Sequence, residues 1–286
     1  RSVVRMILST KQQFVDCLSI NEDSQYIGTY KSLTLNSVYQ PIFDTDDNII
    51  GVEALVRIED SVKGTIRPDQ FFHNQQIDFD DKINVERLSR VIHIRNFARS
   101  QYRHLNLFLN VLPSAGEYFA LENIDSSLLS QRLKALNLEN SQLIMEVVEL
   151  DASNEDNLKL AMKKLSECDF NIAVDDFGVN ASNRHRVERL KPDIVKLDRS
   201  LLISYMTGDQ FPLLSAVKLA KNLGAKVVVE GIETQQHLDA MRSLDIDLYQ
   251  GYFLALPEPL PAVYDDETNN FSSLGDPSIV YRQSYQ

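Results

Sequence analysis

The feature that most constrains this chain is a recurring alternation of short apolar runs with amphipathic stretches. Most of the apolar runs are typical of buried strands, and most end on a polar or charged residue. The eight runs are residues 38–43, 49–53, 107–110, 143–146, 172–175, 194–196, 227–230 and 248–250. Strands that alternate with helices predict a mostly parallel sheet covered by helices.

Several of the connections between these runs have the periodicity of helices. Apolar side chains recur near a 3.6-residue period in residues 82–100, 157–168, 213–223 and 235–244. Gly224 follows the third segment and is a suitable helix stop. Eight such units in about 220 residues predict a TIM-like (β/α)₈ barrel, which is an α/β fold. Only residues 44–48 join the first two runs, so we expect one antiparallel strand pair there.

The two ends of the chain lack this alternation. We interpret residues 1–34 as an N-terminal linker or helical extension, with a helix over residues 6–18 and a polar loop after it. Residues 35–260 form the predicted barrel, and residues 261–286 form a C-terminal extension without periodicity. Because the chain starts at Arg1 rather than Met, we expect it to be part of a longer protein.

Composition excludes several classes of protein. The formal charge of -12 argues against a sequence-independent binder of nucleic-acid polymers, which needs a basic face, and it also weighs against a phosphate-rich ligand. No apolar run is long enough to cross a bilayer, so we expect no membrane contact from this segment. Two cysteines cannot form a disulfide framework, and this pattern favours a reducing, cytoplasmic location.

Polar residues gather at the carboxyl ends of the predicted strands, where barrels carry their functional sites. They are Glu53, Asn110, Glu146, Asp175, Asp176, Lys196, Glu230 and Gln250. Five of them are carboxylates, which would repel one another strongly at one end of a barrel without cations. Oxygen-rich sites of this kind suit Mg²⁺ or Mn²⁺. The adjacent Asp175 and Asp176 favour two metals bridged by one carboxylate.

Lys196 is the one cation in that predicted cluster. A lysine that follows Ile194 and Val195 in a strand is not typical of a solvated surface. It could neutralise the carboxylates, hold an attacking water or contact a phosphate. The alternative is a lysine–aspartate pair that only stabilises the barrel, because structural ion pairs also produce such clusters.

An ordered set of motifs resembles the EAL domain family. The set contains Tyr39–Gln–Pro–Ile42, Gly51–Val–Glu–Ala–Leu–Val–Arg57, Asn110, Glu146–Val–Val–Glu149, Asp175–Asp–Phe–Gly178, Lys196–Leu–Asp198, Glu230–Gly–Ile–Glu–Thr234 and Gln250–Gly–Tyr252. The tripeptide Glu53–Ala–Leu55 matches the one that names the family. The resemblance runs from about residue 35 to residue 260, and the order and spacing make it specific.

The resemblance implies a cyclic di-GMP phosphodiesterase. Such enzymes release linear 5′-pGpG, use Mg²⁺ or Mn²⁺ and are inhibited by Ca²⁺. Carried over by motif, the ligands of the first metal are Glu53, Asn110, Glu146 and Asp175. Asp175 would also bridge to a second metal near Asp176, with Glu230 beside it. The resemblance further allows a homodimer, because the loop after Asp176 is linked to dimer contacts in the family.

The same resemblance assigns the remaining roles. Lys196 would orient the attacking water, and Glu230 is the candidate general base. The expected substrate-binding residues are Arg57, which would contact a phosphate, Asp198, which would lie near a guanine or the lysine, and Gln250, which supports the acidic cluster. Glu149 is expected to brace the loop that follows Asp176.

Several positions depart from the family pattern without replacing a proposed ligand. Val179–Asn–Ala–Ser–Asn183 differs from the usual sequence of the loop, and Ile58, Leu112 and Val148 replace a usual Trp, Ser and Thr. These differences concern loop geometry and regulation more than chemistry.

The alternative class is an inactive EAL-like receptor that binds cyclic di-GMP or a protein partner. Such members usually lose the first Glu, an Asp of the pair or the lysine, and this chain keeps all of them.

Overall fold

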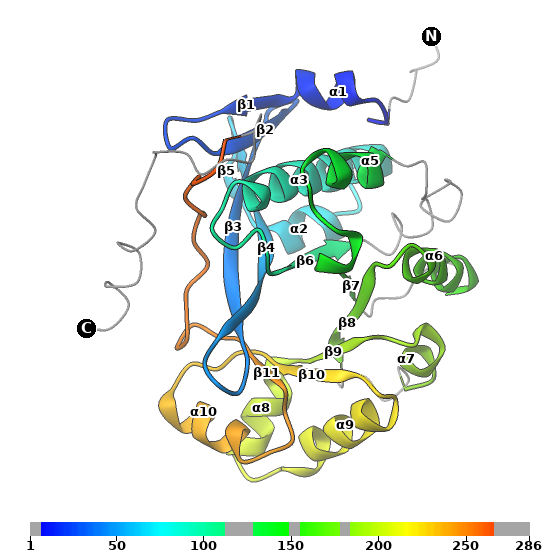
Figure 1. The fold of residues 1–286 in the computed structure, drawn as a ribbon, viewed down its shortest axis with the longest axis vertical. Helices are drawn as coiled ribbons and strands as arrows, with labels where there is room; N and C mark the ends of the chain where they lie inside the picture. The colour runs from blue at the N-terminus through cyan, green and yellow to red at the C-terminus, as the bar shows by residue number, and fades with distance from the viewer. Residues whose placement is uncertain (1–6, 112–127, 149–154, 178–183, 266–286) are drawn as a thin grey trace.

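The computed structural model describes residues 7–111, 128–148, 155–177 and 184–265. Eight strands close into a barrel, because β3 pairs with β4 on one side and with β11 on the other. The barrel strands are β3 (Leu33–Phe43), β4 (Ile49–Asp60), β6 (Asn106–Val111), β7 (Leu143–Val148), β8 (Asn171–Phe177), β9 (Ile194–Leu197), β10 (Lys226–Val229) and β11 (Leu248–Tyr249). The predicted α/β barrel is confirmed (Figure 1).

The direction of β3 sets this barrel apart from a fully parallel one. β3 runs antiparallel to both neighbours, whereas the pairs from β4 through β6 round to β11 are parallel. The turn between β3 and β4 is held by Asp44, whose Oδ1 accepts hydrogen bonds from the backbone N–H groups of Asp46 and Asn48, both at 2.9 Å. The predicted antiparallel hairpin is therefore confirmed.

Helices cover the outside of the barrel (Figure 1). They are α3 (Phe79–Ala98), α5 (Leu128–Ala135), α6 (Glu155–Glu167), α7 (Arg184–Leu190), α8 (Arg199–Met206), α9 (Phe211–Asn222) and α10 (Gln235–Arg242). All four predicted helices are present, and no boundary is shifted by more than three residues. Gly224 lies just beyond α9 with φ +74°, as expected for a residue that ends a helix.

The long β3–β4 hairpin extends beyond the barrel and carries short elements at its far end. β5 (Gly64–Ile66) pairs with the end of β4 and is followed by α2 (Pro68–His73). On the other edge lie α1 (Lys11–Asp16), β1 (Leu18–Ile20) and β2 (Tyr26–Tyr30), and β2 pairs with the start of β3. A helix lies within residues 6–18 as predicted, but the polar loop expected after it is wrong, because two strands form there.

The end of the described chain returns along the same side. Tyr39 and Glu258 exchange backbone hydrogen bonds of 2.8 and 3.0 Å, and the backbone carbonyl of Arg99 accepts from the N–H of Val263 at 2.7 Å. Of the predicted C-terminal extension, only residues 261–265 lie within the described ranges. The division at residues 34 and 260 stays a proposal.

The core has an inner and an outer part. Inside the barrel, side chains such as Ile42, Phe108, Ile144 and Val228 pack together in a buried apolar cluster. Larger apolar clusters fill the space between the strands and the surrounding helices.

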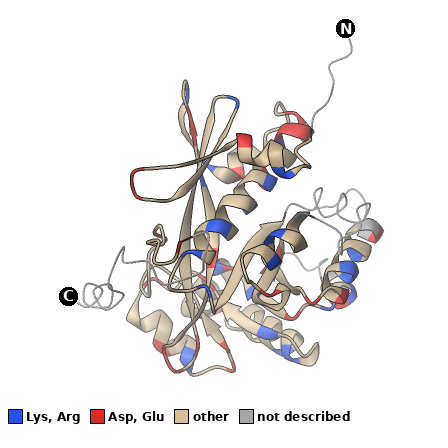
Figure 2. Cartoon of the chain, turned by 45° about the horizontal axis from the view of Figure 1, so that its top comes forward, with Lys and Arg blue, Asp and Glu red and all other residues tan. Residues whose placement is uncertain are grey.

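None of the described helices is both long and apolar enough to span a bilayer. In the view of Figure 2, segments with Lys or Arg and segments with Asp or Glu are interspersed along the described chain.

Candidate metal centre at the carboxyl ends of the strands

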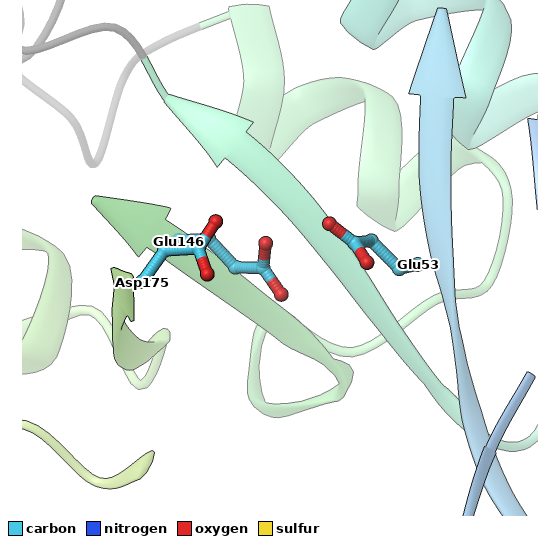
Figure 3. A group of neighbouring side chains, drawn as sticks. All are labelled: Glu53, Glu146 and Asp175. Atoms are coloured by element: carbon cyan, nitrogen blue, oxygen red, sulfur yellow. The ribbon is translucent and has the colours of Figure 1, made fainter. Parts of the chain in front are cut away.

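Five strands bring the predicted acids and the lysine to one place. Glu53 lies on β4, Glu146 on β7 and Asp175 on β8, and Figure 3 shows their carboxylates directed toward one another. Oxygens of these three residues lie within 4.8 Å of each other. Lys196 lies on β9 and Glu230 directly follows β10. Parallel register explains the meeting, because neighbouring strands end at the same edge of the barrel.

Lys196 is the centre of this cluster. Its Nζ lies 2.9 Å from Glu146 Oε1, 2.9 Å from Glu230 Oε1 and 3.2 Å from Glu53 Oε2. Asp175 Oδ1 is 4.0 Å away. The lysine side chain has 0% exposure, so one buried cation faces four carboxylates. The charges do not balance within this group, and buried charge without a partner is costly.

This excess of negative charge, together with burial, shifts the pKa values of the acids. Burial, followed by the charge of Glu53, raises the pKa of Glu146 well above its ordinary value. Burial also raises the pKa of Glu230 to about 8, against the opposing effect of Lys196. Burial acts in the same direction on Glu53, but Lys196 and a hydrogen bond from Gln250 outweigh it and lower the pKa of Glu53. The cluster therefore holds protons near neutral pH that a metal could replace.

A second group of oxygens lies beside the first. Asp175, Asp176 and Glu230 also offer carboxylate oxygens within 4.8 Å of one another. The backbone of Asp176 has φ +53°, and its N–H donates to Asp175 Oδ1 at 2.9 Å. Burial and the charges of Asp175 and Asp198 raise the pKa of Asp176 to about 7. Asp175 belongs to both groups, and its role as a bridging carboxylate stays a prediction.

Amide side chains orient Glu53. Asn110 on β6 donates through Nδ2 to Glu53 Oε1 at 3.3 Å, which leaves the Asn110 carbonyl oxygen available. Gln250 donates to Glu53 Oε2 at 2.6 Å and to Gln40 Oε1 at 3.1 Å. Gln40 in turn donates to the backbone carbonyl of Ala255 at 3.2 Å. The two glutamines thus tie the first metal-ligand candidate to the loop after β11.

Gln40 is the site residue that sequence reasoning missed. It lies opposite Glu53 in the β3–β4 register and is buried. The motif Tyr39–Gln–Pro–Ile42 is part of the family resemblance, but the resemblance gives Gln40 no role. A buried amide before a proline in a strand is the signal that could have found it.

Two of the predicted substrate-binding residues lie outside this cluster. Arg57 is exposed on β4 and donates to the backbone carbonyl of Val56 at 3.3 Å. Asp198 caps α8, where it accepts from the backbone N–H of Ser200 at 2.8 Å. Asp198 is still close enough for its charge to raise the pKa of Asp175 and Asp176. Glu149, Leu112 and the loop at residues 178–183 fall outside the described residues.

The donor set fits a hard divalent cation. Every candidate ligand offers oxygen, and Mg²⁺, Mn²⁺ and Ca²⁺ prefer oxygen. Glu146 Oε2 is buried and has no hydrogen-bond partner among the described residues. A buried carboxylate oxygen normally has a hydrogen-bond partner, and a bound metal ion would supply the missing partner here. An ion pair of Lys196 that only stabilises the barrel would not explain this unpartnered oxygen or the excess of carboxylates over cations in the cluster.

Comparison with known proteins identifies the family. The EAL domain model matches residues 29–257, so the chain belongs to the EAL domain family. It is 31% identical over 235 residues to the cyclic di-GMP phosphodiesterase NbdA of Pseudomonas aeruginosa, covering 79% of this chain and 29% of NbdA. The chain thus spans less than a third of that relative.

Solved structures of EAL proteins have the same fold. The cyclic di-GMP complex of the PaMucR phosphodiesterase matches with a TM-score of 0.64 and 27% identity, covering 79% of this chain and 92% of that one. The manganese and cyclic di-GMP complex of Klebsiella pneumoniae BlrP1 matches with a TM-score of 0.67 and 24% identity, covering 78% of this chain and 56% of BlrP1. At that identity the second likeness supports the fold alone.

Proposed function

We propose that this chain is a divalent-metal-dependent phosphodiesterase that hydrolyses cyclic di-GMP to linear 5′-pGpG. The observation that carries the proposal is the buried acidic cluster around Lys196, in which every ligand predicted from the family motifs is retained. The relatives named above as cyclic di-GMP phosphodiesterases support the choice of substrate. Mg²⁺ or Mn²⁺ is the proposed cofactor, and we expect Ca²⁺ to inhibit.

The residues divide into two groups of ligands. Glu53, Asn110, Glu146 and Asp175 would hold one cation, and Asp175 and Asp176 would hold a second with Glu230 beside it. When bound, divalent cations at such a site polarise phosphate oxygens and make a water molecule more acidic. The two cations would also offset the acidic cluster, so the net charge of -12 no longer weighs against a phosphate-bearing ligand.

The remaining side chains would act on the water and the substrate. Glu230, which lies 2.9 Å from Lys196 Nζ, would act as the general base once a bound cation has displaced the proton that its raised pKa retains in the metal-free protein. Lys196 would stay protonated, because the surrounding carboxylates raise its pKa although burial opposes them, and it would hold the water and these acids in register. Arg57 lies exposed on β4 with a planar guanidinium suited to a phosphate. Asp198 remains the candidate for a contact with guanine.

The test is a hydrolysis assay with a matched pair of variants. The protein is stripped with EDTA, supplied with Mg²⁺, Mn²⁺ or Ca²⁺, and incubated with cyclic di-GMP before the nucleotides are separated by chromatography. We expect 5′-pGpG with Mg²⁺ or Mn²⁺ and little with Ca²⁺. Glu53→Gln should reduce turnover by at least about 100-fold, the loss typical of removing one electrostatic catalytic group. Glu59→Gln, on the exposed end of the same strand, should retain it.

The receptor alternative makes the opposite forecast. An inactive EAL-like module would bind cyclic di-GMP, measured by calorimetry, yet form no 5′-pGpG with either metal. Complete retention of the acidic cluster disfavours that alternative, because a receptor needs no costly surplus of buried carboxylates. Full turnover by Glu53→Gln would instead show that the assignment of the site is wrong.

A homodimer is also proposed for this domain, on the family resemblance alone. Sedimentation of the purified protein over a range of concentrations would test it. A monomer at every concentration would contradict the proposal.

A further inference from the structure

Arg199 begins α8 and lies against the loop that follows β10 and carries Glu230. A Cβ placed on Gly231, the next residue after Glu230, would lie 2.7 Å from Arg199 Cβ and 2.8 Å from Arg199 Cδ. Arg199 Nη2 lies 2.9 Å from Glu233 Oε2. The stem of one arginine therefore covers the residue after Glu230, and its guanidinium group holds the acid three residues further on.

The turn that leads into Arg199 is fixed to two strand ends of the candidate metal centre. The backbone N–H of Asp198 donates to the carbonyl of Phe177, the last residue of β8, at 3.4 Å. The carbonyl of Leu197 accepts from the backbone N–H of Glu230 at 3.3 Å. Arg199 thus starts from a turn that is bonded to both strand ends, so its contacts can hold the loop after β10 in place relative to β8.

Glu230 is the member of the acidic cluster that depends most on such contacts. Of the four carboxylates around Lys196, it is the most exposed, at 21% of its side chain. It precedes Gly231, which has φ +76°, and glycine has the widest choice of backbone conformations. The Glu230 side chain is thus held least by its own packing, and the backbone beside it has to be fixed by neighbouring residues.

We propose that Arg199 is a positioning residue for Glu230 and that it acts through its ion pair with Glu233. The inference rests on the proposed role of Glu230 as the general base. Arg199 is 53% exposed and Glu233 is 45% exposed, and water screens such pairs, so this pair contributes little to the stability of the fold. Its effect is on geometry, because a displacement of about 1 Å can slow catalysis by up to about 100-fold.

Hydrogen exchange tests the restraint without metal or substrate. Exchange of the backbone amides in residues 229–234 is followed by mass spectrometry in EDTA. Arg199→Ala should speed this exchange several-fold, because the loop opens more often when the covering side chain is absent. Arg199→Lys keeps the stem and the charge and should exchange nearly as the unaltered protein does. Arg242→Ala removes an arginine that pairs with Asp47 in the turn before β4, and it should leave the exchange of this loop unchanged.

Steady-state kinetics with Mn²⁺ and cyclic di-GMP test whether the restraint serves Glu230. Arg199→Ala should lower kcat by about tenfold and leave KM nearly unchanged, because the base acts in the transition state. Glu233→Gln should also lower kcat, and the double variant should be no slower than Arg199→Ala, since Glu233 acts through the arginine. Arg199→Lys should recover most of kcat. The Tm of each variant should stay within about 4 °C of the unaltered protein, as expected for a screened pair.

The outcomes separate this inference from the proposed function. Unchanged exchange of residues 229–234 in Arg199→Ala would overturn the inference, and so would faster exchange combined with the same kcat as Arg242→Ala. Additive losses of kcat in the double variant would overturn the role of Glu233. If the unaltered protein forms no 5′-pGpG with Mn²⁺, the proposed hydrolysis is wrong, but faster exchange in Arg199→Ala and not in Arg242→Ala would still support the restraint of the loop that carries Glu230.

Discussion

Lys196 has an environment that few lysines share. It is fully buried, and burial alone would lower its pKa, but the charges of Glu146, Glu230 and Glu53 raise the pKa well above its usual value. The lysine and the acids therefore depend on one another for their charged states. A single substitution at this residue should affect stability and metal affinity in opposite directions.

Lys196→Met tests this dependence. Removing the cation leaves several buried carboxylates without a partner, so we expect the free energy of unfolding at pH 7 in EDTA to fall by about 3–5 kcal/mol. Urea unfolding gives the measurement. Lys226→Met, at the exposed start of β10, should change it by no more than about 0.5 kcal/mol. Because the variant site carries more negative charge, Mn²⁺ should stabilise Lys196→Met more than the unaltered protein. Equal stability of the two variants in EDTA would contradict this account.

His93 is a second buried titratable residue, and it joins α3 to the hairpin. Its Nδ1 lies 2.6 Å from Ser37 Oγ on β3. Burial, helped by the charge of Arg90, lowers the pKa of His93 to about 3 from 6.5. Below about pH 6.5, His93 therefore binds a proton in the unfolded chain but stays neutral in the folded chain until the pH approaches 3. The contribution of His93 to stability is present above pH 6.5 and is lost as the pH falls toward 3.

The pH dependence of unfolding tests that contribution. Between pH 6.5 and 4.5, the unaltered protein should lose stability relative to His93→Gln by up to about 1.4 kcal/mol per pH unit. Urea unfolding at several pH values measures the difference. His73→Gln, which changes an exposed histidine at the end of α2, should follow the unaltered protein. Parallel pH curves for all three proteins would mean that His93 is protonated in the folded state.

At the scale of elements, the loops after β10 and β11 pack closely against each other next to the candidate site. Gly231 has φ +76°, and a Cβ there would lie 2.4 Å from Arg199 Cγ. Arg199 is held over the glycine by an ion pair of 2.9 Å to Glu233. Ile232 donates to the carbonyl of Gln250 at 3.2 Å. Glu230 and Gln250 therefore owe their positions to close backbone packing that a side chain would disturb.

Gly231→Ala should disturb Glu230 through this packing. Both strain at positive φ and the clash with Arg199 oppose the alanine, so we expect a loss of about 1–3 kcal/mol in unfolding free energy and slower hydrolysis of cyclic di-GMP. Gly224→Ala is the matched control, because Gly224 has φ +74° but no atom lies within 4 Å of the position that a Cβ would take there. The control should lose stability from strain alone and keep its turnover. Equal turnover of the two variants would show that the contact with Arg199 does not control the position of Glu230.

The same element scale shows what the sequence could predict. The barrel strands are apolar runs bounded by turns, and in parallel strands the polar residue at each end falls at one edge, so Glu146, Asp175 and Lys196 were predictable. β1 and β2 were missed because they are short and partly polar, so they lack the apolar runs that mark the barrel strands, although β1 pairs with β2 and β2 pairs with the neighbouring β3. Gln40 was missed because β3 runs in the opposite direction, so a residue near the middle of that strand meets the ends of the others.

At the scale of the whole molecule, charge and pH are linked through the acidic site. Folding raises the pKa of Glu230 to about 8 and of Asp176 to about 7, so between pH 4.5 and 8 the folded chain binds protons that the unfolded chain has lost. The stability of the metal-free protein should therefore fall as the pH rises through this range. A metal that needs the ionised carboxylates should instead bind more tightly as the pH rises.

Thermal unfolding at pH 6, 7 and 8, with EDTA or with Mn²⁺, separates these two effects. In EDTA the Tm should decline toward pH 8. The stabilisation by Mn²⁺ should grow by about 1.4 kcal/mol per pH unit for each proton that the metal displaces. Glu230→Gln should flatten both trends, because it removes one of the groups that titrate. A gain from Mn²⁺ that is independent of pH, or that sodium chloride reproduces, would mean that these carboxylates do not hold the metal.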